Sequence, residues 1–91
     1  MNTPLGAFGK RIEDKLEKAF NPLELKVIDE SEKHRGHGGY REGGESHFHV
    51  EIVSENFTGL NRVKCQQLVY KALAEEMQDG IHALSMKTTA P

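Results

Sequence analysis

A run of alternating residues near the middle of the chain limits the possible folds most strongly. Apolar Phe48, Val50 and Ile52 alternate with polar residues at positions 47, 49 and 51. This period of two predicts a strand with one face on a core and the other face polar. Glycines precede the run at 43–44 and Thr58-Gly59 follows it, so the strand is bounded on both sides. The fold must therefore contain a sheet with one covered face.

Two helical patterns lie on either side of this strand in the sequence. The first becomes firm near Phe8 and ends at Asn21-Pro22. The second follows a turn at 54–61 with one short helical turn, starts after Asn61 as its cap, and stops at Gly80, where we expect a left-handed glycine. Each helix has an apolar stripe at helical spacing that should be buried. The stripes comprise Phe8, Ile12, Leu16, Ala19 and Phe20 in the first helix, and Val63, Leu68, Val69, Ala72, Leu73 and Met77 in the second.

Two further alternating segments, 23–28 and 81–88, complete the order helix, strand, strand, helix, strand. A three-stranded mixed sheet with helices packed on one face buries all the apolar stripes at once, so we predict an α+β fold. A chain of 91 residues with 36% hydrophobic content has room for one modest core. We therefore predict a single domain over residues 1–91, with flexible ends at 1–7 and 89–91.

The charge and the composition argue against several classes of function. The chain has 12 basic and 14 acidic residues, a formal net charge of -2, whereas domains built to bind phosphates usually have a basic excess. No apolar run is long enough to cross a bilayer, and the N-terminus lacks the features of a signal peptide. A single cysteine allows no internal disulfide. We expect a soluble cytoplasmic protein.

A long glycine-rich loop over residues 30–44 separates the first two predicted strands. Five of the nine glycines lie in it, and loops of this length in compact domains are usually functional or mobile. The loop carries His34 and His37, two of the five histidines, and His82 opens the third strand. Imidazole is a common metal ligand near neutral pH, so this set is a candidate metal site.

The histidines also have structural interpretations. His47 and His49 share the polar face of the central strand. His82 has the parity of Leu84 and Met86, so the alternative is a partly buried ring at the start of the strand, bonded to a backbone group.

Cys65, Arg62 and Lys64 are the remaining residues that could carry chemistry. Cys65 could be a nucleophile or a metal ligand, but it falls on the apolar face of its helix with Val69, which favours a buried, inert thiol. Arg62 and Lys64 could contact phosphate or could simply belong to a solvated helix start. No phosphate-cradling loop and no nucleophile–base motif is present, so we predict a binding module rather than an enzyme, with no small-molecule substrate.

The sequence resembles the BolA-like proteins over most of its length, from about Arg11 to Pro91. The order and the spacing of six short motifs carry the resemblance. These are Glu45-Ser46-His47-Phe48, Ile52-Val53-Ser54, Phe57-Thr58-Gly59, Leu68-Val69-Tyr70, Leu73-Ala74-Glu75-Glu76 and Ile81-His82-Ala83-Leu84.

This resemblance implies a fold like a type II K-homology domain without its Gly-x-x-Gly nucleic-acid loop, and no enzyme activity. It implies a monothiol glutaredoxin partner, with which the protein shares a [2Fe–2S] cluster bound with glutathione. The implied ligands are His82, in the His-Ala-Leu motif, and a histidine in the loop. His37 matches the loop form best and His34 is the alternative. A cluster of this kind needs four ligands, and two sulfurs from glutaredoxin and glutathione would complete the set.

One departure from the family pattern bears on DNA binding. The family usually has a basic Arg-His-Arg run at the start of the long helix, and this chain has Cys65-Gln66-Gln67 instead. Some bacterial members are described as transcriptional regulators that use this surface. A DNA-binding regulator of morphology or stress genes is therefore the alternative function, with Arg62 and Lys64 as the remaining contacts and weak DNA binding as the expectation.

Overall fold

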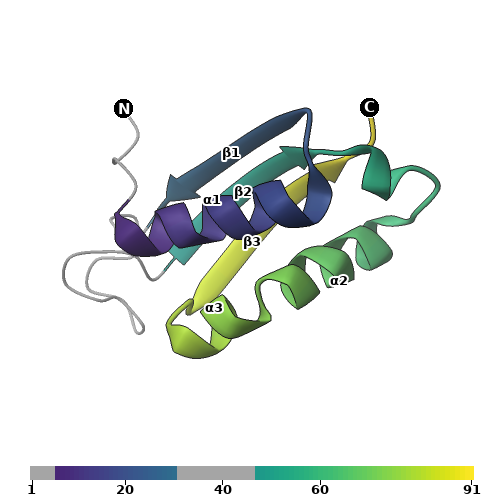
Figure 1. Ribbon diagram of the computed structural model, residues 1–91. Coiled ribbons are helices and arrows are strands. Elements are labelled where there is room, and N and C mark those ends of the chain that lie inside the picture. The colour runs from purple at the N-terminus through teal and green to yellow at the C-terminus, as the bar shows by residue number, and fades with distance from the viewer. Residues whose placement is uncertain (1–5, 31–46) are drawn as a thin grey trace.

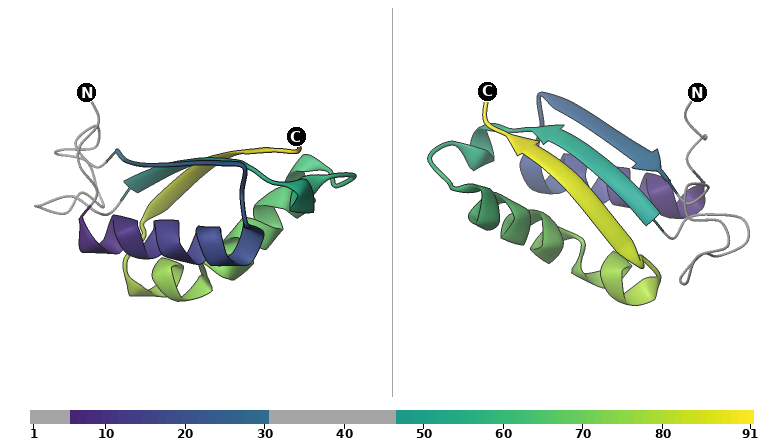
Figure 2. Two further views of the ribbon diagram at one scale, coloured as in Figure 1. Left: turned by 45° about the horizontal axis from the view of Figure 1, so that its top comes forward. Right: turned by 180° about the vertical axis from the view of Figure 1, so that it is seen from behind.

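The computed structural model describes residues 6–30 and 47–91, and shows helices on one face of a small sheet (Figures 1 and 2). The observed order agrees with the predicted order, except that the last helix is divided in two. The elements are α1 (Ala7–Phe20), β1 (Glu24–Asp29), β2 (His47–Val53), the 3-10 turn η2 (Glu55–Phe57), α2 (Arg62–Ala72), α3 (Ala74–Asp79) and β3 (Ala83–Thr89).

β2 is the central strand of the three-stranded sheet. It pairs antiparallel with β1 and parallel with β3. α2 and α3 make the crossover that a parallel connection requires. The register aligns Val27 with Val50 and Val50 with Met86, so one set of alternating residues faces the helices. The predicted α+β fold with a mixed sheet is confirmed.

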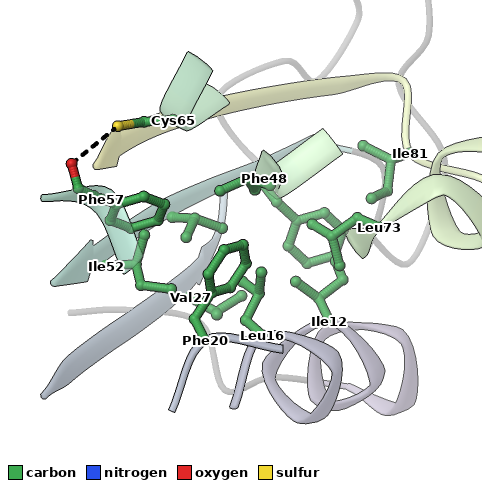
Figure 3. Packing of buried hydrophobic residues seen from close by; sticks show 12 residues of the cluster. Ile12, Leu16, Phe20, Val27, Phe48, Ile52, Phe57, Cys65, Leu73 and Ile81 are labelled. Atoms are coloured by element: carbon green, nitrogen blue, oxygen red, sulfur yellow. Dashed lines mark hydrogen bonds between the residues drawn. The ribbon is translucent and has the colours of Figure 1, made fainter. Parts of the chain in front are cut away.

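The core lies between the sheet and the helices (Figure 3). Ile12 and Leu16 of α1 are fully buried against Phe48 and Ile52 of β2. The rings of Phe20 and Phe57 pack with their centroids 5.2 Å apart, which joins the end of α1 to η2. The alternation in β2 and the stripe on α1 therefore meet as predicted.

The predicted boundaries of the helices depend on local bonds, and most are confirmed. Asn21 adopts the left-handed conformation, with φ 44°, and ends α1 just before Pro22. The Asn61 Oδ1 atom accepts a hydrogen bond of 2.9 Å from the Lys64 N–H and caps α2. Gly80 ends α3 with φ 168°, so the prediction of a left-handed glycine there is wrong.

The predicted stripe of the second helix is wrong in part. The helix is interrupted at Leu73, which has the non-helical angles φ -103° and ψ 18° and separates α2 from α3. This break places Leu73 in the core and changes which residues of the helices face the sheet. Val63 is 60% exposed and Leu68 is 36% exposed, whereas Cys65 and Val69 are buried.

Small differences also occur at the other predicted edges. Ala19 is exposed rather than part of the buried stripe on α1. β3 begins at Ala83, two residues later than predicted, and ends at Thr89, whose carbonyl accepts a hydrogen bond from the Ser54 N–H at 3.0 Å. The flexible ends and the extent of the domain stay predictions.

Candidate functional site

His82 lies between α3 and β3, and its side chain is exposed. The backbone on both sides of it is held in place. The N–H groups of Gly80 and Ile81 both donate to the Glu76 carbonyl, at 3.1 and 3.2 Å, and Ile81 is buried in the core. Ala83 then pairs with His47 at the start of β3. The interpretation of His82 as a partly buried ring is wrong, because residue 82 precedes the strand and its parity does not apply.

The His47 ring stacks on the His82 ring, with centroids 6.2 Å apart and an angle of 22° between the planes. His47 is only 6% exposed, although the alternating pattern placed it on a polar face. No pattern in the sequence pairs these two histidines, which are 35 positions apart. The parallel register of β2 and β3, which aligns His47 with Ala83, is what brings the two histidines together.

The segment that carries the predicted loop ligands begins and ends beside this histidine pair. The Glu30 N–H donates to the His47 carbonyl at 2.8 Å, which extends the pairing of β1 and β2 by one residue. The end of β1 and the starts of β2 and β3 lie at the same end of the sheet (Figure 1). His34 and His37 themselves fall outside the described residues, so their assignment stays a prediction.

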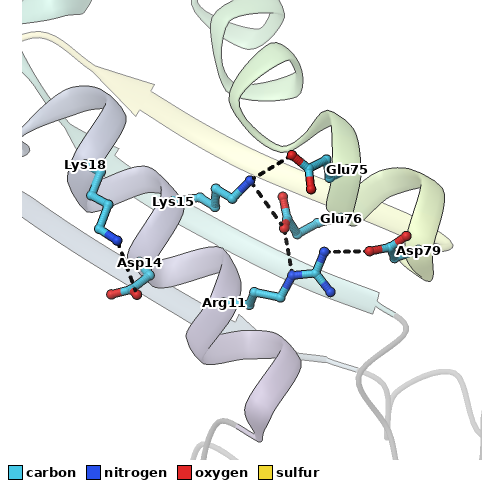
Figure 4. A network of polar contacts seen from close by, with 7 residues as sticks. All are labelled: Arg11, Asp14, Lys15, Lys18, Glu75, Glu76 and Asp79. Carbon is cyan, nitrogen blue, oxygen red and sulfur yellow. Dashed lines mark hydrogen bonds and ion pairs between the residues drawn. The ribbon is translucent and has the colours of Figure 1, made fainter.

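A network of ion pairs connects α1 to α3, the helix that ends three residues before His82 (Figure 4). The Glu76 side chain is fully buried, and its Oε2 atom accepts a hydrogen bond of 2.8 Å from the Arg11 Nε. The Lys15 Nζ lies 3.8 Å from the same oxygen. Arg11 also binds Asp79, and this hydrogen bond raises the pKa of Arg11 above its ordinary value. No sequence pattern indicated this network, because Arg11 and its partners Glu76 and Asp79 are 65 and 68 positions apart in the sequence.

The second Glu76 oxygen, Oε1, is buried and has no hydrogen-bond partner among residues 6–30 and 47–91. A buried carboxylate needs compensation from nearby charges. Here Arg11 and Lys15 supply it through Oε2 alone. The Glu76 side chain is thus energetically costly in the core and holds α3 against α1, while the Glu76 backbone carbonyl accepts the hydrogen bonds that fix the turn before His82.

Cys65 lies at the other end of β3 from His82. It is 4% exposed, and its Sγ lies 4.0 Å from the Phe57 carbonyl oxygen and 3.9 Å from that of Leu60 (Figure 3). The prediction of a buried thiol is confirmed. No three His, Cys, Asp or Glu side chains among residues 6–30 and 47–91 are grouped so that they could hold a metal ion.

His49 is separate from the histidine pair in its bonding. Its Nδ1 lies 2.7 Å from the Ser85 Oγ, and its Nε2 lies 3.2 Å from a Glu51 carboxylate oxygen. These contacts hold the ring on the sheet face that the helices leave uncovered. Of the three histidines among residues 6–30 and 47–91, His82 is therefore the one with an exposed side chain.

Arg62 and Lys64 are both exposed at the start of α2. Arg62 lines a groove of about 460 Å³ together with Lys87. This basic region is at the far end of β3 from His82, so the structure does not bring the two sets of predicted residues into one site. None of the described helices has both the length and the apolar character needed to cross a membrane.

Comparisons with known proteins agree with this architecture of a small α+β domain. A family model described as BolA-like protein matches residues 16–91. The chain is 44% identical over 91 residues to SufE-like protein 1, chloroplastic/mitochondrial, of Arabidopsis thaliana, covering 96% of this chain and 24% of that protein. It is 43% identical over 79 residues to the DNA-binding transcriptional regulator BolA of Escherichia coli (strain K12), covering 87% of this chain and 71% of the relative.

A solved structure shows the same fold. The BolA domain of SufE1 from Arabidopsis thaliana superposes with a TM-score of 0.87 at 44% identity, covering 97% of this chain and 96% of that one. The chain belongs to the BolA-like family. It spans about a quarter of the length of the first relative and about half of another Arabidopsis relative, Protein BOLA1, chloroplastic.

Proposed function

We propose that this protein is an adaptor in iron–sulfur cluster trafficking or regulation, which shares a [2Fe–2S] cluster with a monothiol glutaredoxin. The observation that carries the proposal is the exposed His82, held at the end of the sheet where residues 31–46 begin and end. Membership of the BolA-like family supports it. The absence of enzyme activity and the location in the cytoplasm stay predictions.

The donor set of the chain fits a shared cluster. A [2Fe–2S] cluster takes four ligands. His82 is one exposed imidazole, and His37, or His34 as the alternative, would add a second. Cys65 is buried far from His82 in the fold, so the two remaining ligands would be sulfurs of glutaredoxin and glutathione. When bound, the cluster would supply the iron–sulfur centre that is passed on or sensed.

The residues around His82 would act as a rigid support for it. Ile81 is anchored in the core and Ala83 in the sheet, so little backbone entropy remains to be lost when the imidazole binds. The stacked His47 ring also restricts the directions open to the His82 ring. The protein would therefore contribute one ligand in a nearly fixed position and a second from residues 31–46.

The test is to mix this protein with its own monothiol glutaredoxin, iron, sulfide and glutathione, and to record visible absorption and circular dichroism. The wild type should give the bands of a mixed cluster that neither protein gives alone. His82→Ala should lose nearly all of this signal while its far-ultraviolet spectrum stays unchanged. His49→Ala is the matched control and should keep the signal, because its ring is bonded to Ser85 and Glu51. A wild-type cluster spectrum from His82→Ala would disprove the ligand assignment.

A second candidate function is DNA binding, which the similarity to the DNA-binding transcriptional regulator BolA of Escherichia coli favours. Arg62 and Lys64 are exposed and available to phosphates. The net charge of -2 and the uncharged residues 65–67 argue for weak, non-specific binding. Two cations neutralise few phosphates, so the expected binding to a DNA duplex is weak, whereas a steep loss of binding as salt is raised would indicate real phosphate contacts. A sequence-specific footprint that survives moderate salt and disappears in Arg62→Ala would reverse the ranking of the two functions.

A further inference from the structure

β3 is an edge strand. Among the residues that the structure describes, it pairs only with β2, and β1 forms the opposite edge of the sheet (Figure 2). The Thr89 carbonyl accepts from the Ser54 N–H, so the backbone of Thr89 faces β2. Successive residues of a strand direct their N–H and C=O groups to alternate sides. Residues 84, 86 and 88 therefore direct theirs to the open side.

Tyr70 supports this assignment and limits the length of the open edge. Its hydroxyl, on α2, donates to the Leu84 carbonyl at 3.4 Å, which confirms that this carbonyl points away from β2. The first position of the edge is therefore occupied by a side chain of the protein. Met86 and Thr88 carry the N–H and C=O groups of the remaining part.

A groove lies beside this remaining part of the edge. It has a volume of about 460 Å³ and is bounded by the start of α2 and the second half of β3. Its lining includes apolar Leu60 and Met86 and the cations Arg62 and Lys87, with no acidic residue from the described chain. Leu60 is 37% exposed. The groove is thus partly apolar and positively charged, in a chain with a formal net charge of -2.

We propose that this groove binds an extended acidic segment of a partner protein, which adds as a fourth strand to the free edge of β3. The segment would exchange backbone hydrogen bonds with Met86 and Thr88, as in other cases of strand addition. An apolar side chain would rest on Leu60 and Met86, and carboxylates of the segment would meet Arg62 on the helix side of the added strand and Lys87 on its other side. At about 3.3 Å per residue, the edge from Ser85 to Thr89 has room for a segment of about five residues.

The unpaired backbone groups on the open edge of β3 favour a peptide over a nucleic acid as the ligand of the groove. Arg62 and Lys87 could hold a phosphate, but the edge of β3 offers a regular row of amide donors and carbonyl acceptors that only another strand matches in full. This binding surface goes beyond the proposed cluster function. It lies at the opposite end of β3 from His82, so the two sites can be tested separately.

The probe is a pool of acetylated and amidated hexapeptides, with β-branched residues at alternate positions and two fixed aspartates. A second pool with lysines in place of the aspartates is the control. We expect the acidic pool to shift the backbone amide resonances of Met86, Thr88 and Arg62 in a saturable way, and the lysine pool to cause no such shifts. Methylation of alternate backbone nitrogens of the acidic peptides should abolish binding, because it removes the donors of the added strand.

Variants of the protein test the two parts of the proposal. Thr88→Pro removes an N–H on the open side only, where an edge strand tolerates proline, and Arg62→Glu reverses a charge at an exposed position. Each should weaken binding by about tenfold, as for the loss of a hydrogen bond or a charged contact. Lys26→Glu, the same change of charge on the exposed surface of β1, should have no effect. His82→Ala should also bind normally, which separates this proposal from the cluster site.

Several results would overturn the proposal. These are a lack of saturable binding by the acidic pool, equal binding of the two pools, and unchanged affinity in both Thr88→Pro and Arg62→Glu. Competition by a mixed-sequence single-stranded DNA that binds the groove more tightly would assign the groove to nucleic acid. Sedimentation that shows the edge already occupied in a dimer of this chain would assign it to a second copy.

Discussion

The two ends of β3 are built in different ways. At its start, His82 is exposed but lies between a buried isoleucine and a paired strand residue, and a buried carboxylate holds the preceding helix. At its end, Arg62 and Lys87 line an open groove beside backbone groups that no described strand pairs. The first end is suited to hold one ligand in a fixed position. The second end is suited to accept a partner whose own backbone completes the contact.

This difference follows from where the protein places its buried charge. Glu76 is fully buried at the first end and is compensated by Arg11 and Lys15. The cations at the second end, Arg62, Lys64 and Lys87, are exposed, and none of them forms an ion pair with a buried carboxylate of the described residues. A buried charge with partners from another helix constrains the geometry of a site, whereas exposed cations mainly attract ligands. Substitution of Glu76 is the most direct test of this difference between the two ends of β3.

The largest expected effect on stability comes from Glu76→Ala. It removes a fully buried side chain and leaves Arg11 and Lys15 without their common partner. We expect a loss of about 3 kcal/mol in the free energy of unfolding, from the lost packing and the broken ion pairs, measured by denaturant titration. The mixed cluster with glutaredoxin should weaken in parallel, because the Glu76 carbonyl, which accepts from the N–H groups of Gly80 and Ile81, is displaced when the ion pairs no longer hold α3 against α1.

Glu75→Ala is the matched control for this change. The Glu75 side chain is 75% exposed and contacts Lys15 at 3.4 Å, so its removal should cost about 0.5 kcal/mol or less. Equal stability of the two alanine variants would show that the buried network does not hold α3. Glu76→Met, which fills the volume without charge, should recover much of the stability, since buried ion pairs are often replaceable by apolar residues.

Local signals account for the features that the sequence predicted well. The alternation at Phe48, Val50 and Ile52 and the caps at Asn21 and Asn61 depend on neighbours within a few residues. They are found where expected. The conformation of each of these residues is determined by backbone geometry or by a hydrogen bond to a near neighbour in the sequence. The order of elements and the α+β class follow from such signals.

Features that depend on distant contacts could not be predicted in this way. The break at Leu73 changes the buried face of the last helix, so Glu76 enters the core and Val63 leaves it. The stacking of His47 on His82 requires the parallel register of β2 and β3. A partner for Glu76 on α1, 65 positions away in the sequence, has no signal in local periodicity. These long-range contacts form the surroundings of the candidate site. For that reason the sequence predicted His82, whose exposure the structure shows, but not the residues around it.

A smaller effect is expected from the ligand in residues 31–46. His37→Ala should reduce the mixed cluster signal but leave part of it, because His34 lies three positions away in a glycine-rich segment and can replace it. The His34→Ala/His37→Ala double variant should lose the signal to the same degree as His82→Ala. The comparison uses visible circular dichroism at equal concentrations of protein and glutaredoxin.

Two results would contradict this difference between the ligands. Complete loss in His37→Ala alone would show that the loop ligand is as strictly placed as His82. An unchanged signal in the double variant would show that residues 31–46 supply no histidine ligand, and that the fourth position is filled by another group. Folding of each variant is checked by far-ultraviolet circular dichroism.

The smallest effect is expected from Cys65→Ala, which tests whether the far end of β3 takes part in cluster binding. Cys65 is 4% exposed, and its thiol meets the carbonyls of Phe57 and Leu60 only at 4.0 and 3.9 Å, so its contribution is mainly that of a small apolar group. We expect a loss of about 1 kcal/mol in the free energy of unfolding and an unchanged cluster spectrum. Loss of the cluster from a folded Cys65→Ala protein would mean that the two ends of β3 serve one site, because the only thiol of this chain would then be a ligand. An unchanged spectrum together with the expected small loss of stability would confine cluster binding to the His82 end.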